Sequence, residues 1–336
     1  MPYENLSSSL LSLGFAPRTK LNTDRIWYTY WREDVNAVKS YIFVYNDAWD
    51  RELGSGSSDG SVTFQTTGVP YMYDAWTGDQ HAILGYTQAG GTTTIPLTLA
   101  GNQSTIIAFH HNEVASCPRH PQNSPAELYG MHSHDDDTIW VKSGRQTHPI
   151  HLPNGTVYMP PSASAPLNLT DWNLIIESWS APKDIYADQT QSTKANMSYT
   201  LTSLQPWTSI SDSLRNTSGR GFYTTTFPWP PAGGREDGAM LDLGAVVNTA
   251  RLWINGHLLP PLDPTHAVSD ISEFLQHGQN KVLVVVATTL GNAVRPHWEQ
   301  LRSSGTLALG PLPPVQEYGL VSDVLVKPYK NVKITM

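Results

Sequence analysis

Short stretches in which large apolar and polar side chains alternate recur along the first third of this chain. RIWYTYWRE (25–33) shows the alternation typical of a strand with one buried face. Similar stretches follow at regular spacing, separated by Gly, Asp and Asn: SYIFVYND, SVTFQTTG, VPYMYDAWTGD, HAILGYTQ, TTTIPLTLA and QSTIIAFHH. Short strands with turn residues between them predict a small β-sandwich at 26–111, preceded by a helix and linker at 1–25.

A second set of strand patterns occupies the last half of the chain. KVLVVVATT (281–289) is apolar on both faces and rich in β-branched residues, which predicts a central strand. The other stretches are LNLTDWNLIIESWSAP, SGRGFYTTTFPWP, GAMLDLG, ARLWING and YGLVSDVLVKPY. We therefore expect a second sandwich at 166–336, joined to the first by a Pro-rich connection at 112–165. The sequence contains no βαβ alternation, so a (β/α)8 barrel is excluded.

Turn residues in the second half predict local structure. RLWINGHLLPP (251–261) has Asn255-Gly256 between two strand patterns, which is typical of a tight hairpin turn with positive φ values. DISEFLQHG is expected to form a short helix that Asp270 caps and Gly278 ends. Gly221 is expected at a sharp turn at a strand end.

The composition agrees with an all-β protein. Among 336 residues, only 15% are charged, whereas Gly and Pro number 25 each, Trp 11 and Tyr 15. The net charge is −8 without a basic run, so nucleic acid is excluded as a partner, and no apolar run has the length of a membrane span. One cysteine, Cys117, allows no intrachain disulfide, and it precedes Pro118 without the neighbours that activate a nucleophile.

Six Asn-x-Ser/Thr triplets favour the secretory pathway and N-glycosylation: Asn5, Asn102, Asn154, Asn168, Asn196 and Asn216. The N-terminal residues show no signal-peptide pattern, so we expect either that a signal peptide has been removed or that the protein has none.

The order SGRGFYTTTFPWP, GAMLDLG, ARLWING, DISEFLQHGQN, KVLVVVATTLGNAVRP resembles the galactose-binding-like jelly roll of glycoside hydrolase family 2 and its relatives. The resemblance is closer to the C-terminal region of fungal α-L-rhamnosidase-type hydrolases. There, a small β-sandwich resembling YIFVYND, GVPYMYDAWTGD and TTTIPLTLAGNQSTIIAF precedes the jelly roll. This resemblance implies two β-sandwich domains, the second a jelly roll, and a hairpin that is mainly a marker of that fold.

The same resemblance does not carry glycosidase activity to this chain. Those hydrolases place their carboxylates on a barrel, and no Asp or Glu here matches a catalytic position of that family. One interpretation is a carbohydrate-binding accessory protein. The other, which we expect first because a chain without a barrel needs its own activity, is a stand-alone enzyme of fungal secondary metabolism.

The enzyme interpretation follows a resemblance in size and architecture to the hetero-Diels–Alderases of tropolonic sesquiterpenoid pathways. It implies dehydration of an apolar substrate to a quinone methide and cycloaddition with a terpene alkene, without a cofactor. Positioning of the two reactants, one acid–base group and a few hydrogen-bond donors would supply the catalysis.

Candidate site residues come from loops and strand ends rich in aromatic and titratable groups. The predicted catalytic residues are Arg295, His297, His266 and Asp74, where a proton donor or a carbonyl-polarising group is needed. The predicted substrate-binding residues, whose rings suit sugars and flat apolar molecules, are Trp229, Trp298, Tyr71, Tyr73, Trp76 and His110. The alternatives are loop residues bonded to the backbone, and aromatic rings that seal an interface between the sandwiches. His132-Ser-His134 followed by three Asp has the ligand types of a metal site, but its Pro-rich surroundings favour a solvated loop, so we predict no metal.

Overall fold

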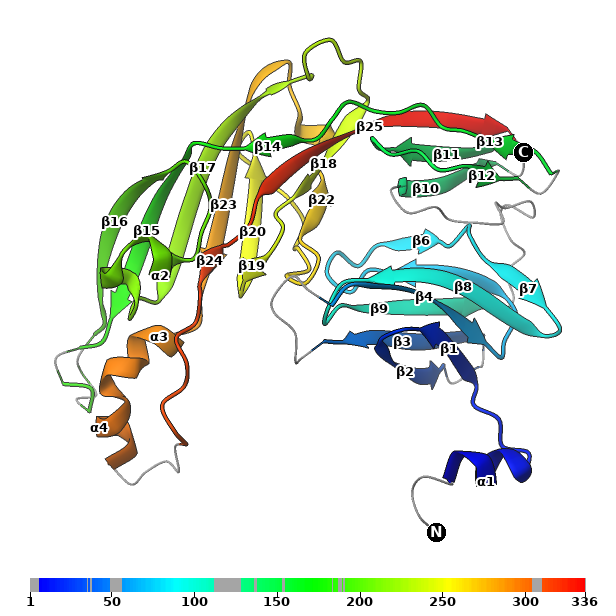
Figure 1. Ribbon diagram of the computed structural model, residues 1–336, viewed down its shortest axis with the longest axis horizontal. Helices are drawn as coiled ribbons and strands as arrows, with labels where there is room; N and C mark the ends of the chain where they lie inside the picture. Colours follow the sequence, from blue (N-terminus) through cyan, green and yellow to red (C-terminus); the bar gives the residue numbers. More distant parts are fainter. Residues whose placement is uncertain are drawn as a thin grey trace. The chain divides into compact units, whose positions relative to one another are not determined.

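The computed structural model describes residues 6–34, 36, 38–48, 56–111, 128–135, 138–152, 155–182, 184–186, 189, 191–303 and 310–335. The chain forms two compact units (Figure 1). Unit 1 contains Met1–Trp140, His148–Pro160 and Lys333–Met336, and unit 2 contains Val141–Thr147 and Pro161–Val332. Strands dominate both units, so the predicted all-β sandwich fold is confirmed.

Unit 1 begins with helix α1 (Leu6–Ser12) and is built around two antiparallel sheets, coloured blue to cyan in Figure 1. The four-stranded sheet has the order β1 (Thr19–Thr23), β4 (Ser58–Phe64), β8 (Thr92–Leu99), β7 (Thr87–Ala89). The five-stranded sheet has the order β2 (Ile26–Glu33), β3 (Lys39–Asp47), β9 (Ser104–His110), β5 (Val69–Tyr73), β6 (Gln80–Ala82).

The core of unit 1 lies between these sheets. Alternate residues of β3 and β8 are buried, because successive side chains of a strand point to opposite faces. The buried cluster consists of Trp27, Ile42, Val44, Val62, Phe64, Tyr86, Ile95, Leu97, Leu99, Ile107 and Phe109.

Unit 2 is a second sandwich. Its six-stranded antiparallel sheet has the order β16 (Thr193–Leu201), β15 (Trp172–Ser180), β17 (Gly219–Trp229), β23 (Gly278–Ala287), β20 (Thr249–Ile254), β21 (His257–Leu258). A second six-stranded sheet has the order β10 (Leu128–Asp135), β11 (Thr138–Ser143), β25 (Val324–Thr335), β18 (Gly238–Asp242), β22 (Val268–Asp270), with β14 (Leu167–Leu169) paired to β25. Of this sheet, β10 and the first half of β11 are counted in unit 1. The shorter strands form two pairs: β12 (Ile150–His151) with β13 (Val157–Tyr158) in unit 1, and β19 (Val246–Val247) with β24 (Gly319–Leu320) in unit 2.

β23 pairs with both β17 and β20, which confirms the predicted central strand. The core beside it contains two fully buried indoles, Trp172 and Trp207. Gly221 lies inside β17 and not at the expected turn. Glycine is required at this position because a Cβ would lie 2.7 Å from the Trp207 ring. The Trp207 indole in turn donates a 2.7 Å hydrogen bond to the Tyr223 hydroxyl, so this polar group is satisfied within the core.

The helices of unit 2 are short: α2 (Trp207–Ile210), η2 (Asp212–Leu214), η3 (Ser272–Phe274), α3 (Gly291–Val294), η4 (Arg295–His297) and α4 (Trp298–Ser303). The helix predicted in DISEFLQHG is one 3₁₀ turn, η3. Asp270 closes a turn by accepting from the Ser272 N–H rather than capping a helix, and Gly278 begins β23 with a φ of +94°. None of the described helices combines the length and apolarity that crossing a membrane requires.

The hairpin at β20–β21 has the predicted turn. Asn255 and Gly256 have φ values of 52° and 87°, and Ile254 pairs with His257 across the turn. The Asn255 side chain donates to the Phe274 carbonyl and to Asn280 Oδ1, both at 2.8 Å. These bonds link the hairpin to neighbouring elements, which agrees with a structural role for the hairpin in the fold.

The structure of two stretches differs from what the predicted segment boundaries imply. Thr19–Thr23 forms β1 within the segment 1–25, where a helix and linker were expected; Leu21 is its one large apolar residue, so the strand pattern is weak. Val141–Thr147, within the expected connection 112–165, belongs to unit 2.

Candidate functional site

Five aromatic side chains of β2 and β3 share the outer face of the five-stranded sheet. We call them the aromatic platform: Tyr28, Tyr30, Tyr41, Phe43 and Tyr45. The antiparallel register places Tyr28 opposite Tyr45 and Tyr30 opposite Phe43. Residues directly opposite one another project from the same face, so the rings form two adjacent cross-strand pairs.

The platform is open to solvent along the edge strand β2. Tyr30 is 65% exposed, Tyr28 55% and Phe43 41%. The rings of Phe43 and Tyr45 stack with their centroids 6.4 Å apart and an interplanar angle of 15°. The Tyr45 hydroxyl donates a 3.0 Å hydrogen bond to Asn102 Oδ1, which fixes one end of the platform. Single exposed apolar residues are common on protein surfaces, but a contiguous exposed aromatic surface of this kind indicates a binding site.

Sequence reasoning did not single out these residues, although the signal was present. In RIWYTYWRE, Trp27 and Trp31 alternate with Tyr28 and Tyr30, so both faces of the strand carry large rings. One set fills the core, and the other must then face outward. The pattern could have indicated an exposed aromatic face, but it did not indicate which set would be exposed.

Three predicted binding residues form a second aromatic group on the same sheet face. The Tyr71 ring stacks on the His110 ring at a centroid distance of 4.3 Å, and the Tyr73 hydroxyl lies 2.9 Å from His110 Nε2. Tyr41 of the platform contacts Tyr73 edge-to-face at 5.8 Å. Because His110 is only 5% exposed, its place in this group is to hold the two tyrosine rings.

Asp74 and Trp76 lie in the turn that follows β5. One Asp74 carboxylate oxygen accepts hydrogen bonds from the Trp76 N–H at 2.7 Å and the Thr77 N–H at 3.2 Å. This carboxylate therefore organises the turn, a local role that Asp commonly has. The Trp76 side chain is 44% exposed.

The predicted site residues Arg295, His297 and Trp298 lie on consecutive turns of unit 2. Arg295 and His297 belong to η4, and Trp298 begins α4, where its indole donates to the Gly310 carbonyl at 3.2 Å. The Nε and Nη1 atoms of Arg295 are buried and have no hydrogen-bond partner within the described part of the chain.

His297 also lines an apolar pocket of about 350 Å³ in unit 2. The Trp179 indole lies on its wall and donates to Glu177 Oε1 at 2.8 Å. The pocket is lined by Trp179, Ser180, Ala181, Pro182, Ile185, Ser192, Leu290, Ala293, Val294, His297 and Leu301. This volume lies at the lower end of the range of small-molecule sites.

Trp229 lies at the opposite end of the sheet from η4. In the register of β17 with β23, Trp229 pairs with Gly278, whereas Arg220 pairs with Ala287, close to η4. Nine strand steps separate the two ends by about 30 Å. Trp229 is also only 9% exposed and belongs to the core of unit 2, because its ring meets the apolar interior of the sandwich.

His266 is exposed in the turn before β22, where its N–H bonds to the Asp263 carbonyl at 3.1 Å. It is thus separate in sequence and in its contacts from the η4 group.

A polar pocket of about 540 Å³ lies along β14, β15 and β17. Its lining consists of Leu167, Asn168, Leu169, Thr170, Asp171, Asn173, Thr224, Thr225, Thr226, Phe227, Pro228 and Lys281. Phe227 is the aromatic residue of this lining, and it is only 1% exposed, so the pocket offers no ring face to a ligand.

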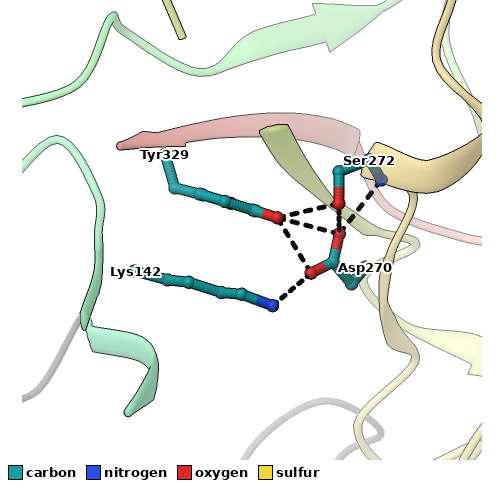
Figure 2. Close-up of polar contacts among 4 residues, drawn as sticks. All are labelled: Lys142, Asp270, Ser272 and Tyr329. Carbon is teal, nitrogen blue, oxygen red and sulfur yellow. Dashed lines mark hydrogen bonds and ion pairs between the residues drawn. The ribbon is translucent and has the colours of Figure 1, made fainter. Parts of the chain in front are cut away.

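Four side chains from three distant parts of the sequence form a polar cluster in unit 2 (Figure 2). The Lys142 ammonium lies 2.6 Å from Asp270 Oδ2, and the Tyr329 hydroxyl donates to the two Asp270 oxygens at 3.2 and 3.0 Å. The Ser272 hydroxyl also donates to Asp270 and lies 2.8 Å from the Tyr329 oxygen. The Lys142 ammonium additionally lies 5.3 Å from the centre of the Tyr329 ring.

Electrostatics of this cluster favour a charged Asp270 and a neutral Tyr329. Burial alone would raise the pKa of Asp270, but the hydrogen bonds from Lys142 and Ser272 outweigh it and hold that pKa below its usual value. Burial, with the charge of Asp270, raises the pKa of Tyr329 to about 12. The cluster therefore contains a stable ion pair and a tyrosine that resists ionisation, which suits a structural role.

The His132–Asp137 segment lies partly outside the described residues. The backbone of His132 and His134 belongs to β10 rather than to the expected loop, but the structure describes neither side chain, and residues 136–137 and Cys117 lie outside it. Among the residues that are described, no three His, Cys, Asp or Glu side chains are placed to hold a metal ion.

The glycosylation triplets differ in their surroundings. Asn168, Asn196 and Asn216 are exposed. Asn102 is engaged in a turn, where its Oδ1 accepts from the Ala48 N–H at 3.1 Å and its φ is +63°. Asn5 and Asn154 lie outside the described residues.

Comparisons with known proteins give structural matches. No protein-family model matches the chain, and no curated protein matches it. A rhamnosidase from Novosphingobium sp. PP1Y aligns with 96% of this chain and 26% of its own, with a TM-score of 0.60 at 18% identity. Two β-glucuronidases from Faecalibacterium prausnitzii, the first of them FMN-binding, align with 48% and 51% of this chain and 22% and 32% of theirs, with TM-scores of 0.28 and 0.31 at 15% and 17% identity. The chain thus spans about a quarter of the rhamnosidase's length, and the two proteins share a fold in that region.

Proposed function

We propose that this protein binds carbohydrate through the aromatic platform of unit 1. The exposed cross-strand pairs of rings carry this proposal. Tyr28, Tyr30 and Phe43 expose between 41% and 65% of their surface on one sheet face. Ring faces of this kind pack against the apolar C–H faces of sugar rings, while tyrosine hydroxyls exchange hydrogen bonds with sugar hydroxyls.

The spacing of the rings fits an extended ligand. Tyr28 and Tyr30 are two residues apart on one strand, so their Cα atoms are separated by about 7 Å. Within the described part of the chain, their hydroxyls have no hydrogen-bond partner, which leaves them available to a ligand. The shared fold with a protein described as a rhamnosidase agrees with a carbohydrate ligand.

The experiment is a calorimetric titration of the purified chain with oligosaccharides of four to six units that contain rhamnose, galactose, glucose or uronic acid. We expect Tyr30→Ala to weaken binding about tenfold, which is about 1.4 kcal/mol, whereas Tyr30→Phe keeps the ring face and changes the affinity much less. Leu258→Ala is the matched control, because Leu258 is 49% exposed on unit 2 and its loss should have no effect.

Two results would contradict the proposal. The first is that no oligosaccharide binds at millimolar concentration, although the chain is folded. The second is that one binds with an affinity that is the same in the wild type, in Tyr30→Ala and in Tyr28→Ala.

The apolar pocket of unit 2 supports a second candidate function, the binding of an apolar small molecule. Ala293, Val294 and Leu301 present aliphatic surface, and His297 supplies the titratable group of the lining. An apolar pocket with few polar groups is the environment that the enzyme interpretation requires. Dehydration and cycloaddition in this pocket stay predictions.

Titration with N-phenyl-1-naphthylamine, a neutral apolar probe, tests this second function. Saturable enhancement of the probe's fluorescence at one site is expected. A signal that grows linearly with probe concentration would reject the pocket as a binding site.

A further inference from the structure

Arg32 closes one end of the aromatic platform with a positive charge. It lies on β2 directly opposite Tyr41 of β3, so it projects from the same sheet face as the rings. It is two residues from Tyr30, and its side chain is exposed. Lys39, two residues before Tyr41 on β3, lies on this face as well.

Among the described residues, no neighbouring carboxylate neutralises these two cations. Glu33 projects from the other face of β2, where it forms an ion pair with Arg18. Asp34 closes the β2–β3 turn, because one of its oxygens accepts from the Asn36 N–H at 3.1 Å and from the Val38 N–H at 3.0 Å. Neither Arg32 nor Lys39 forms an ion pair within the part of the chain that the structure describes.

The net negative charge of the chain indicates that this local pair of cations has a specific role. The chain has a net charge of −8, so unpaired positive groups beside an exposed binding surface are not a by-product of a basic protein. Net negative charge would also repel an anionic ligand at long range, and only a local pairing can compensate for that repulsion.

Resting on the proposed carbohydrate function, we propose that the platform recognises an acidic sugar and that Arg32 binds its carboxylate. The planar guanidinium presents two parallel N–H donors, a geometry that matches the two oxygens of a carboxylate. A uronic acid ring lying on Tyr30 and Phe43 would place its carboxylate toward the next cross-strand pair, about 7 Å along the strand, where Arg32 lies beside Tyr41. Lys39 adds a second positive charge on the same side.

The ligand pair that tests this proposal is a hexagalacturonate oligosaccharide and its methyl ester. Both have the same sugar rings, but only the acid carries charges. At low ionic strength we expect the wild type to bind the acid at least about tenfold more tightly than the ester, and this preference to shrink at 0.5 M salt, where exposed charges are screened.

Arg32→Gln should remove most of the preference for the acid, because it weakens binding of the acid much more than binding of the ester. Arg251→Gln is the matched control, because Arg251 is exposed on β20 of unit 2 and should not alter the preference. Arg32→Lys should restore part of the preference for the acid, since lysine retains the positive charge but lacks the two parallel N–H donors of the guanidinium.

The outcomes separate this proposal from the one on which it rests. If the wild type binds acid and ester equally, or if Arg32→Gln keeps the preference, the acidic-sugar proposal is wrong, while carbohydrate binding that depends on Tyr30 stands. If a sulfated neutral-backbone oligosaccharide binds more tightly than the uronate through Arg32, the assignment of a carboxylate ligand is overturned. If neither acid nor ester nor any other oligosaccharide binds, both proposals fail.

Discussion

Lys142 and Asp270 form an ion pair across two intervening strands of unit 2. The Lys142 ammonium lies 2.6 Å from Asp270 Oδ2, yet β11 and β22 are separated in the sheet by β25 and β18. Figure 2 shows the Tyr329 side chain of β25 beside Lys142, with the hydroxyl and the ammonium both directed at Asp270. The pair thus links strands that do not share backbone hydrogen bonds.

Removal of the Asp270 carboxylate should destabilise the protein. Asp270→Asn keeps the size of the side chain but loses the ion pair and weakens the bonds from Ser272 and Tyr329. We expect a loss of about 1–3 kcal/mol in the free energy of unfolding, measured by urea denaturation at pH 7. The matched control is Lys194→Met, which removes a 49% exposed side chain whose ammonium lies 3.8 Å from Glu177 and should change stability by less than about 0.5 kcal/mol. Equal losses in the two variants would show that the cluster contributes no more than a surface pair.

The contribution of Asp270 should depend on pH in one direction. The pKa of Asp270 is lowered in the folded protein, so the folded state binds fewer protons than the unfolded state near that pKa. Its stabilisation is fully present above the ordinary carboxyl pKa of about 4 and is lost as the pH falls through the folded value. The stability difference between wild type and Asp270→Asn should therefore be constant from pH 7 to pH 5 and shrink below pH 4. If the stability difference instead increased on acidification, ionised Asp270 would not be the stabilising form, and the prediction would be wrong.

Gly238 makes room for this cluster. It pairs with Tyr329 in the register of β18 and β25, and a Cβ at this position would lie 2.5 Å from the Tyr329 ring and 2.6 Å from the Ser272 Cβ. Gly238→Ala should therefore lower the free energy of unfolding by about 1–3 kcal/mol, because the tyrosine cannot stay in contact with Asp270. Gly310→Ala, where nothing lies within 4 Å of the added Cβ, is the control and should be nearly neutral in thermal unfolding. A Gly238→Ala variant as stable as this control would mean that the cluster tolerates displacement of Tyr329.

The strand pattern of the chain was sufficient to predict the sandwich fold. In KVLVVVATT, alternate residues of β23 fill the core while the intervening apolar residues are half-buried, which is what a central strand requires. By contrast, Leu21 is the one large apolar residue of β1, and this strand forms because its backbone pairs with β4. Pairing partners are set by tertiary structure, so a short polar strand leaves little trace in the local sequence.

The candidate site was harder to predict than the fold. Tyr71, Tyr73 and His110 stand at strand ends and near turns, where the sequence predicts ligand-binding residues, whereas Tyr28 and Tyr30 stand inside a strand pattern that predicts only one buried face. Trp229 was predicted to bind a ligand because its ring suits sugars and flat apolar molecules, but it belongs to the core of unit 2. Lys142 and Asp270 are 128 residues apart, so no local pattern could have indicated their contact.

The side chain of Asn255 should stabilise the hairpin beyond its turn. Its amide bonds to the Phe274 carbonyl and to Asn280, and its Oδ1 accepts from the Lys281 N–H at 2.8 Å. Asn255→Ala loses these three bonds and keeps a non-glycine residue at a φ of 52°, so we expect a loss of about 2–4 kcal/mol in unfolding free energy. Asn255→Gly relieves the φ strain and should recover part of the loss. Melting temperatures of the two variants give the comparison, and an Asn255→Gly variant less stable than Asn255→Ala would contradict the role of backbone conformation.

Ala293 provides a way to close the apolar pocket of unit 2 without altering the platform. Its side chain lines the pocket, while its backbone N–H is held by the Ser218 hydroxyl at 3.1 Å. A phenyl ring at this position would occupy a large part of the 350 Å³ and exclude a ligand that fills the wild-type pocket. Ala293→Phe should therefore raise the dissociation constant of N-phenyl-1-naphthylamine at least about tenfold, measured by probe fluorescence, since about 1.4 kcal/mol of apolar contact is lost. Oligosaccharide binding by the same variant should equal that of the wild type, because Tyr28, Tyr30 and Phe43 are unchanged. Loss of both ligands together would show that the variant is misfolded or that one site serves both, and unchanged probe binding would place the probe outside this pocket.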